Sequence, residues 1–154
     1  MRPTYLVRGA GSHDAPVITE FNLLLAWETE HLRLDPVVVA RGVRRVLGDA
    51  GLGRYFVAEQ AGRVVGQCSV TYEWSDWRDG MWWWLQSVYV GKDARGAGAF
   101  RSLFDHVAGE ARAAGALGLR LYVEQDNRVA QEVYVRRGMQ RTPYQVYEWT
   151  LPRD

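Results

Sequence analysis

The sequence predicts an α+β domain with a mixed, mostly antiparallel central sheet flanked by helices. Three observations predict it: amphipathic segments of helical period open the chain, alternating runs joined by tight turns occupy its middle, and helical and strand periods alternate toward its end. A length of 154 residues fits one compact domain. We therefore expect a single domain over residues 1–154, with the element order β-α-α-β-β-β-α-β-α-β.

A short strand and two helices are expected in the N-terminal third. Residues 5–8 form the strand. Asp14 is the expected N-cap of a helix that has Pro16 in its first turn and continues to about residue 31. Asp35, which also precedes a proline, starts the second helix in the same way. The apolar positions that define the two helices are Ile18, Phe21 and Leu25, and then Val39, Val43, Val46 and Leu47.

Three strands are expected in the middle of the chain. Residues 55–59, 64–73 and 81–90 are rich in β-branched and aromatic side chains. Ala61-Gly62 separates the first two runs, and Asp79-Gly80, a strong hairpin signal, separates the second and third. These turns are short, so the three strands should be antiparallel neighbours.

Helix and strand alternate after residue 91. An amphipathic helix of about 15 residues is expected before Gly115. A strand at 119–123, a helix at 127–137 that ends at Gly138, and a last strand at 145–151 complete the domain. The inward positions expected for the two helices are Leu103, Phe104, Val107, Ala108 and Ala111, and then Val129, Val133 and Tyr134.

The composition favours a soluble cytoplasmic protein. Nineteen Lys and Arg against 18 Asp and Glu leave a net charge of +1, which disfavours a protein whose main partner is nucleic acid. Cys68, the one cysteine, can form neither an internal disulfide nor a zinc site by itself. The apolar run near the N-terminus is too short for a signal peptide, and no run is long enough to span a membrane.

Segment 91–101, GKDARGAGAFR, is the first candidate binding site. Small residues at the start of a helix let its free N–H groups approach a ligand, and the partial positive charge there favours a phosphate or pyrophosphate. Arg95 and Arg101 can add charge-assisted bonds. A tight strand-to-helix turn without a ligand is the alternative. A P-loop and a dinucleotide fingerprint are both disfavoured, since neither motif is complete here.

Two motifs of the chain resemble the GNAT family of acetyltransferases. Residues 95–100, RGAGAF, are similar to its acetyl-CoA signature, Arg/Gln-x-x-Gly-x-Gly/Ala, except that Phe100 fills the last position. Residues 127–139, NRVAQEVYVRRGM, are similar to its segment Asn-x-x-Ala-x-x-x-Tyr-x-x-x-Gly-Phe/Met. The resemblance covers roughly residues 54–151. It implies a GNAT-like fold and an N-acetyltransferase that moves the acetyl group of acetyl-CoA to a primary amine of a small molecule or peptide by direct attack on the thioester.

The resemblance also implies which residues contact acetyl-CoA. Tyr134 matches the tyrosine that protonates the departing thiolate, for which a phenol with a pKa near ~10 is suited; an ordinary core aromatic is the alternative. Asn127 matches a position near the pantetheine, and a helix N-cap is its alternative or additional role. The implied main-chain contacts are those of Val88, Tyr89 and Val90 to the pantetheine arm, and those of Arg95, Gly96, Ala97, Gly98, Ala99, Phe100 and Arg101 to the pyrophosphate.

The general base is less defined by the resemblance. Many family members have a Glu on the strand before the loop, but Trp84 stands at that position here. Of the nearby carboxylates, Glu73 is favoured over Asp76, because it interrupts an aromatic run in which burial would raise its pKa. A solvated hairpin carboxylate is the alternative for Glu73. His31 and His106 are weaker candidates, and His106 is expected on a helix surface.

The aromatic residues around the expected hairpin have two interpretations. Alternation along the strands buries about half of them. The others either line an acceptor pocket, where a ring face would favour a cationic or aromatic amine, or form a homodimer surface. A catalytically silent acyl-CoA sensor or interaction module also stays open as a function, because Trp84 and Phe100 depart from the family pattern. The aromatic residues concerned are Tyr72, Trp74, Trp77, Trp82, Trp83 and Trp84.

Overall fold

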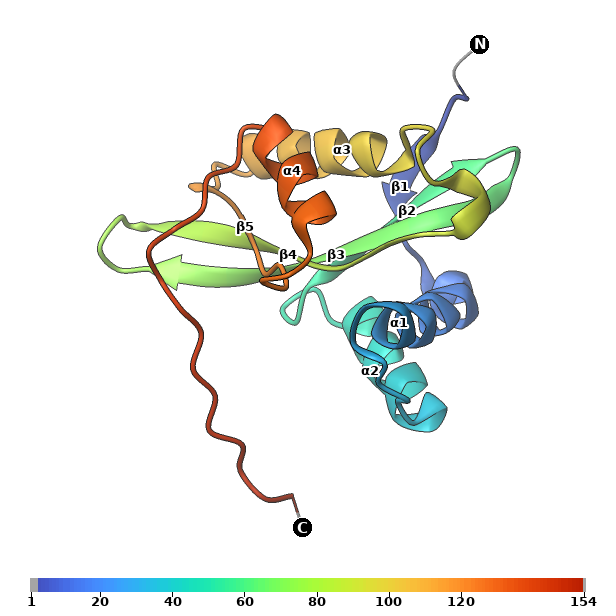
Figure 1. The fold of residues 1–154 in the computed structure, drawn as a ribbon, viewed down its shortest axis with the longest axis horizontal. Helices are drawn as coiled ribbons and strands as arrows, with labels where there is room; N and C mark the ends of the chain where they lie inside the picture. The colour runs from blue at the N-terminus through green and yellow to red at the C-terminus, as the bar shows by residue number, and fades with distance from the viewer. Residues whose placement is uncertain (1–2, 154) are drawn as a thin grey trace. The chain divides into compact units, whose positions relative to one another are not determined.

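A computed structural model describes residues 3–153 and shows the mixed α+β architecture (Figure 1). The chain forms two compact units, one that ends at Tyr122 and one that begins at Val123. The C-terminal unit contains α4 (Arg128–Arg136). The N-terminal unit contains β1 (Leu6–Gly9), η1 (Ser12–Asp14), α1 (Ala15–Glu30), α2 (Pro36–Gly48), β2 (Arg54–Gln60), β3 (Arg63–Ser75), β4 (Gly80–Val90), η2 (Lys92–Ala94), α3 (Ala99–Ala113) and β5 (Gly118–Leu121).

The sheet has the strand order β1-β2-β3-β4-β5. Neighbours are antiparallel except for β4 and β5, which are parallel. The parallel pair is short and runs from Trp82 opposite Gly118 to Leu85 opposite Leu121. The three antiparallel strands expected in the middle of the chain are thus confirmed. The long hairpin of β3 and β4 forms the centre of the sheet.

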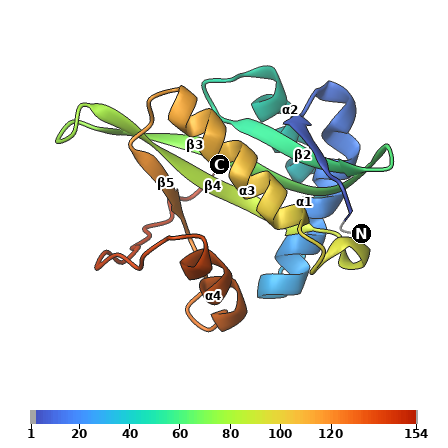
Figure 2. The same ribbon diagram turned by 90° about the horizontal axis from the view of Figure 1, so that it is seen from above.

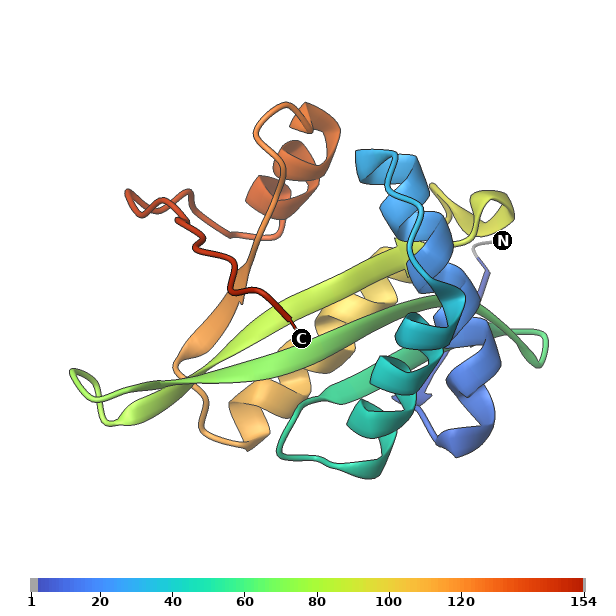
Figure 3. The ribbon, with the colours of Figure 1, turned by 90° about the horizontal axis from the view of Figure 1, so that it is seen from below.

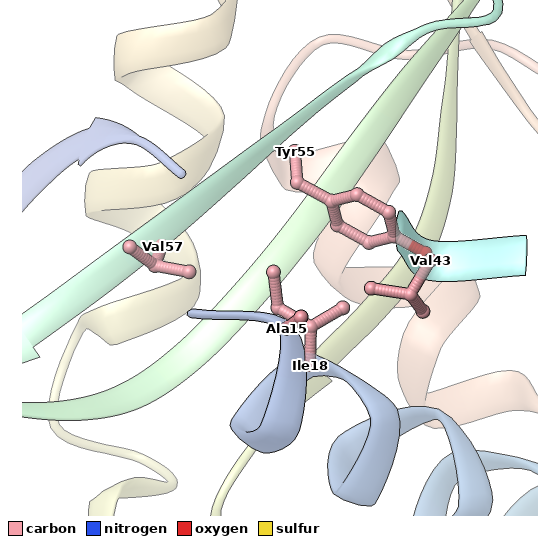
Figure 4. Close-up of a cluster of buried hydrophobic side chains, with 5 residues drawn as sticks. All are labelled: Ala15, Ile18, Val43, Tyr55 and Val57. Atoms are coloured by element: carbon pink, nitrogen blue, oxygen red, sulfur yellow. The ribbon is translucent and has the colours of Figure 1, made fainter. Parts of the chain in front are cut away.

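Helices cover the two faces of this sheet. α3 crosses one face, while α1 and α2 pack on the other (Figures 1 and 2). On the α3 side, the ring of His106 meets the buried ring of Phe56 with 5.5 Å between centroids. On the opposite side, Tyr55 and Val57 of β2 pack with α1 and α2 in a buried cluster (Figure 4). The cluster consists of Ala15, Ile18, Val43, Tyr55 and Val57.

Asp14 is the N-cap residue of α1, as expected, but its side chain makes no capping hydrogen bond to that helix. Its carboxylate instead accepts hydrogen bonds from Arg8 Nη1 at 2.8 Å, Arg8 Nη2 at 3.0 Å and the N–H of Gly11 at 2.8 Å. Arg8 also pairs with Glu59 of β2. The hydrogen bonds from Arg8 are the largest cause of a lowered pKa at Asp14. The carboxylate therefore joins β1 to the start of α1.

Asp14→Asn is expected to lower the free energy of unfolding by about 2–4 kcal/mol near neutral pH, since Asp14 is buried and Arg8 would lose one of its two carboxylate partners. The native carboxyl has a lowered pKa, so its stabilisation is full above the unfolded pKa of about 4 and disappears as the pH falls through the native pKa. Chemical denaturation across pH tests this. The control Asp49→Asn changes an exposed carboxylate whose one donor within residues 3–153 is the N–H of Gly51. Equal losses in the two variants would contradict the role of Asp14.

The C-terminal unit departs from the expected pattern at two places. Residues 145–151 form no strand, and the chain there is exposed and irregular. Alternating apolar residues predicted a strand, but a strand also needs a hydrogen-bonded partner, and the described residues offer this segment none. Val129 is 77% exposed, so its expected inward position is wrong. No helix within residues 3–153 has both the length and the apolar character needed to cross a membrane.

Candidate active site

The turn between β4 and α3 presents free backbone donors. Gly98, at φ +105°, is the N-cap of α3, and it has no side chain that could cap the helix. The first helical bond runs from the N–H of Ser102 to the carbonyl of Gly98 at 3.0 Å. Among residues 3–153, no backbone carbonyl accepts from the N–H groups of Gly96, Ala97 or Gly98. The start of α3 is therefore available to an anion.

A hollow of about 510 Å³ lies beside this turn. A Cβ built on Gly96 or Gly98 would meet no atom within 4 Å, so both glycines face open space. Positive φ angles, +75° and +105°, explain why glycine stands at both positions. The hollow is lined by Pro3, Tyr5, Gly96, Ala97, Gly98, Arg101 and Ser102.

Phe100 does not line the hollow, although its position in the motif suggested that it could obstruct a ligand. Its ring lies 5.9 Å from that of Phe104, one helical turn further along α3. The side chain thus packs along the helix. The large residue at the last position of the motif leaves the hollow open.

Arg95 and Arg101 have different environments. Arg95 Nη2 lies 2.8 Å from Glu28 Oε2 of α1, and Arg95 Nε donates to the carbonyl of Val90. Burial favours the neutral form of Glu28, but hydrogen bonds from Arg95 and Tyr89 outweigh it and lower the pKa of this carboxyl. Arg101 is largely exposed and lines the hollow. Arg101 is therefore better placed than Arg95 to meet an anion with its side chain.

The outer edge of β4 has no partner strand near the turn. Register with β5 ends at Leu85, and β4 continues to Val90. Within the described residues, no strand pairs with that edge at Val88, Tyr89 or Val90. An extended molecule can add to such an edge through main-chain hydrogen bonds. The edge leads directly into the turn before α3.

Five side chains form a layered cluster on the sheet, which we call the aromatic face: Glu73, Trp82, Trp84, Arg120 and Tyr122. Arg120 Nη1 lies 2.7 Å from Glu73 Oε1, and its guanidinium carbon lies 4.0 Å from the centroid of the Trp82 ring. Trp84 Nε1 donates to the same Glu73 oxygen at 3.2 Å. Trp84 also stacks on Tyr122 with centroids 4.5 Å apart. Figure 3 shows the β3–β4 hairpin extending beyond α1 and α2.

This geometry changes two expectations from the sequence. Glu73 is exposed and paired with Arg120, so the expected burial of its carboxylate is wrong. The cation on the Trp82 ring is the chain's own Arg120, a contact that no local sequence pattern predicts. The alternation of buried and exposed aromatics is confirmed. Trp83 is 6% exposed and meets Tyr72 edge-on, on the opposite side of β4 from the aromatic face.

The other candidate bases lie apart from the aromatic face. Asp76 is exposed at the tip of the β3–β4 hairpin. His31 is exposed and ends α1 in the left-handed conformation, with φ 53°. His106 is half-buried against Phe56 on the α3 side of the sheet, so its expected place on the helix surface is only partly correct.

Two further candidates belong to the C-terminal unit. Asn127 Oδ1 accepts from the N–H of Ala130 at 3.1 Å and is the N-cap of α4, as one interpretation of the sequence expected. Tyr134 lies on α4 and is half-buried. Burial raises the pKa of its phenol above the ordinary value, so the hydroxyl stays protonated through the neutral range.

The thiol of Cys68 is expected to be unreactive in the native protein. The residue is 1% exposed, and burial raises its pKa to about 12. Only the thiolate is a good nucleophile, so a disulfide reagent should titrate no thiol until denaturant is added and then one per chain. Rapid native labelling would contradict the burial of Cys68. A silent Cys68 also permits measurement of CoA release by thiol titration.

A mixed, mostly antiparallel sheet in which β4 leads through a glycine-rich turn into α3 defines the α+β class of this fold, and comparison with known proteins identifies its family. The family described as Acetyltransferase (GNAT) family matches residues 21–139. The chain belongs to this family, as its two motifs had suggested. No curated protein matches the chain.

Solved structures share this fold over nearly the whole chain. A possible acetyltransferase from Clostridium difficile 630 is 39% identical with a TM-score of 0.90, and the match covers 97% of this chain and 99% of that one. A predicted acetyltransferase from Clostridium acetobutylicum with acetyl-CoA is 16% identical with a TM-score of 0.77, covering 94% and 96%. The first confirms the expected α+β fold with its mostly antiparallel sheet, whereas the second shows similarity of fold alone.

Proposed function

We propose that the protein is an acetyl-CoA-dependent N-acetyltransferase that acetylates a primary amine of a small molecule or peptide. The observation that carries this proposal is the turn before α3, where free N–H groups of Gly96, Ala97 and Gly98 adjoin the hollow of about 510 Å³. A pyrophosphate fits such a group of donors at a helix N-terminus. Arg101 adds a positive charge on the wall of the hollow.

The remaining cofactor contacts follow from the edge of β4. Main-chain groups of Val88, Tyr89 and Val90 bind the pantetheine arm in this proposal, because that edge has no partner strand among the described residues. Asn127 lies near the pantetheine by its match to the family motif. Asn127 belongs to the C-terminal unit, so its role rests on the motif alone, and the single domain stays a prediction.

Acetyl-CoA supplies the acetyl group and a thiolate leaving group, and side chains of the protein donate and accept the protons. Tyr134 donates its phenolic proton to the departing thiolate, a role supported by its motif position and its raised pKa. Glu73 takes a proton from the acceptor ammonium, and the free amine then attacks the thioester carbonyl as the C–S bond breaks. The second proton that the nitrogen loses restores the phenol of Tyr134 through solvent. Two observations support this role of Glu73. It lies on the aromatic face, and its Oε2 accepts no hydrogen bond from a described residue, because Trp84 and Arg120 both donate to Oε1.

Amine-dependent release of CoA tests the proposed function. Incubation with acetyl-CoA and a panel of primary amines should release thiol only with some amines, and mass spectrometry should show the acetylated amine. Binding of acetyl-CoA without release for any amine would instead support the silent sensor, which Trp84 in place of a glutamate favours.

Glu73→Gln is expected to reduce kcat/KM most at low pH. There the acceptor is mostly ammonium and needs a base, whereas at high pH free amine is already abundant and the variant should approach the wild type. The exposed ion pair with Arg120 adds only about 0–1 kcal/mol of stability, so the variant should fold. Glu110→Gln, in the exposed pair with Arg54, is the control. Matching pH profiles for Glu73→Gln and wild type would exclude Glu73 as the base.

A further inference from the structure

β4 is interrupted by a bulge at Ser87 and Val88. The register with β3 passes from Ser69 opposite Gln86 to Gln67 opposite Tyr89, which leaves two residues of β4 opposite one of β3. Ser87 has a φ of 49°, in the left-handed region that a serine adopts only at a cost. Other contacts must therefore hold the bulge in this conformation.

The side chain of Gln67 supplies such a contact. It is fully buried, and its Nε2 donates to the carbonyl of Ser87 at 3.2 Å and to Asn22 Oδ1 of α1 at 2.7 Å. Asn22 Nδ2 in turn donates to the hydroxyl of Tyr55 at 3.0 Å. A buried polar relay thus runs from Tyr55 through Asn22 and Gln67 to the bulge.

The orientation of the Gln67 amide is specific. Its Oε1 is buried and has no hydrogen-bond partner among the described residues. Turning the amide over would place Oε1 against the Ser87 carbonyl and Asn22 Oδ1, so three oxygen acceptors would face one another without a proton. In this orientation Gln67 Oε1 stays without a donor among the described residues, while Gln67 Nε2 donates to the Ser87 carbonyl. A buried acceptor without a partner costs free energy, so we ask what function the bond to Ser87 serves.

The hydrogen bond from Gln67 to the Ser87 carbonyl fixes the orientation of the peptide group between Ser87 and Val88. The carbonyl of Ser87 and the N–H of Val88 belong to the same planar trans unit and point in opposite directions. Fixing the carbonyl toward Gln67 therefore directs the Val88 N–H away from Gln67. Val88 is also the first of the three β4 residues assigned to the pantetheine arm.

We propose that Gln67 is a positioning residue for acetyl transfer: by holding the Ser87 carbonyl, it fixes the direction in which the Val88 N–H meets the pantetheine arm. This inference rests on the proposed function. Gln67 itself touches neither substrate, and it acts through the Ser87–Val88 peptide. A main-chain donor that is already oriented holds the pantetheine arm, and with it the thioester, in place without reorganisation during the reaction.

Gln67→Met, which keeps the length of the side chain and removes both donors, is expected to lower kcat about 10- to 100-fold. The Kd for CoA should change less than about threefold, because the turn before α3 is untouched. Asn22→Ala should have a smaller effect, and Tyr55→Phe, at the far end of the relay, the smallest. Cys68→Ala, which alters the buried neighbour of Gln67, is the control and should retain wild-type kcat.

Amide hydrogen exchange at Val88 provides a readout independent of turnover. In the CoA complex, faster exchange at Val88 in Gln67→Met and Asn22→Ala than in the wild type, together with the graded loss of kcat, would support the inference, because the pantetheine arm protects this N–H in the proposal. Unchanged exchange, or wild-type kcat in folded Gln67→Met, would overturn it while leaving the proposed function intact. If the wild type shows no amine-dependent turnover, the proposed function and the catalytic role of Gln67 are both wrong. The exchange rate at Val88 then still shows whether Gln67 holds the Ser87–Val88 peptide.

Discussion

Tyr134→Phe is expected to lower kcat about 100-fold, since the variant keeps the ring and loses only the proposed proton donor. CoA leaves as a thiolate and must be protonated, whereas packing by the ring is nearly unchanged. The Kd for CoA should therefore stay at the wild-type value. Steady-state kinetics combined with calorimetry separates these two effects.

The pH dependence of Tyr134→Phe makes this test specific. Burial disfavours the phenolate, so the raised pKa keeps the wild-type phenol protonated beyond the ordinary tyrosine range. Wild-type kcat should fall only at still higher pH, as the proton is lost, and the variant should lack this alkaline decline. Tyr144→Phe, at a residue that is 73% exposed, is the matched control. If Tyr134→Phe turns over like wild type at every pH, another group or water is the acid.

Gly98→Ala is expected to weaken CoA binding at least about tenfold, equivalent to about 1.4 kcal/mol. The φ of Gly98 is +105°, which alanine adopts only with strain, and relief of that strain would rotate the N–H groups at the start of α3. An added methyl group would also project into the open space beside the turn. Calorimetric titration with CoA measures the loss.

Gly109→Ala is the matched control for the glycine substitution. Gly109 lies within α3, and an added Cβ there meets no atom within 4 Å. Alanine should stabilise the helix by about 0.5–1 kcal/mol and leave CoA affinity unchanged. If both variants bind CoA like wild type, the turn before α3 does not hold the pyrophosphate.

Local sequence signals were enough to predict most of the fold. Pro16 and Asp35 signal the starts of two helices, and Asp79-Gly80 signals a hairpin. Each signal depends on neighbouring residues only, and the structure has the corresponding elements. The segment at 145–151 shows the limit of this reasoning. Its alternation satisfies a local rule, but strand formation depends on a partner edge elsewhere in the chain.

The candidate site was predictable where it is local and not where it is assembled by tertiary contacts. The glycine-rich turn before α3 is contiguous in sequence, so its free donors could be anticipated. The pair of Arg120 with Glu73 spans 47 positions and forms only because β5 adds parallel to β4. The bulge at Ser87 has no glycine to signal its positive φ, and only the polar pair Gln86 and Ser87 in an otherwise apolar strand could have suggested it.

Calorimetric titration with CoA and with pantetheine, which has no phosphate, tests the central claim most directly. If the N–H groups before α3 hold the pyrophosphate, CoA should bind at least about 100-fold more tightly than pantetheine, a difference of about 2.7 kcal/mol. The difference should shrink in Gly98→Ala. Failure of CoA to bind at millimolar concentration, or equal affinities for CoA and pantetheine, would contradict the account.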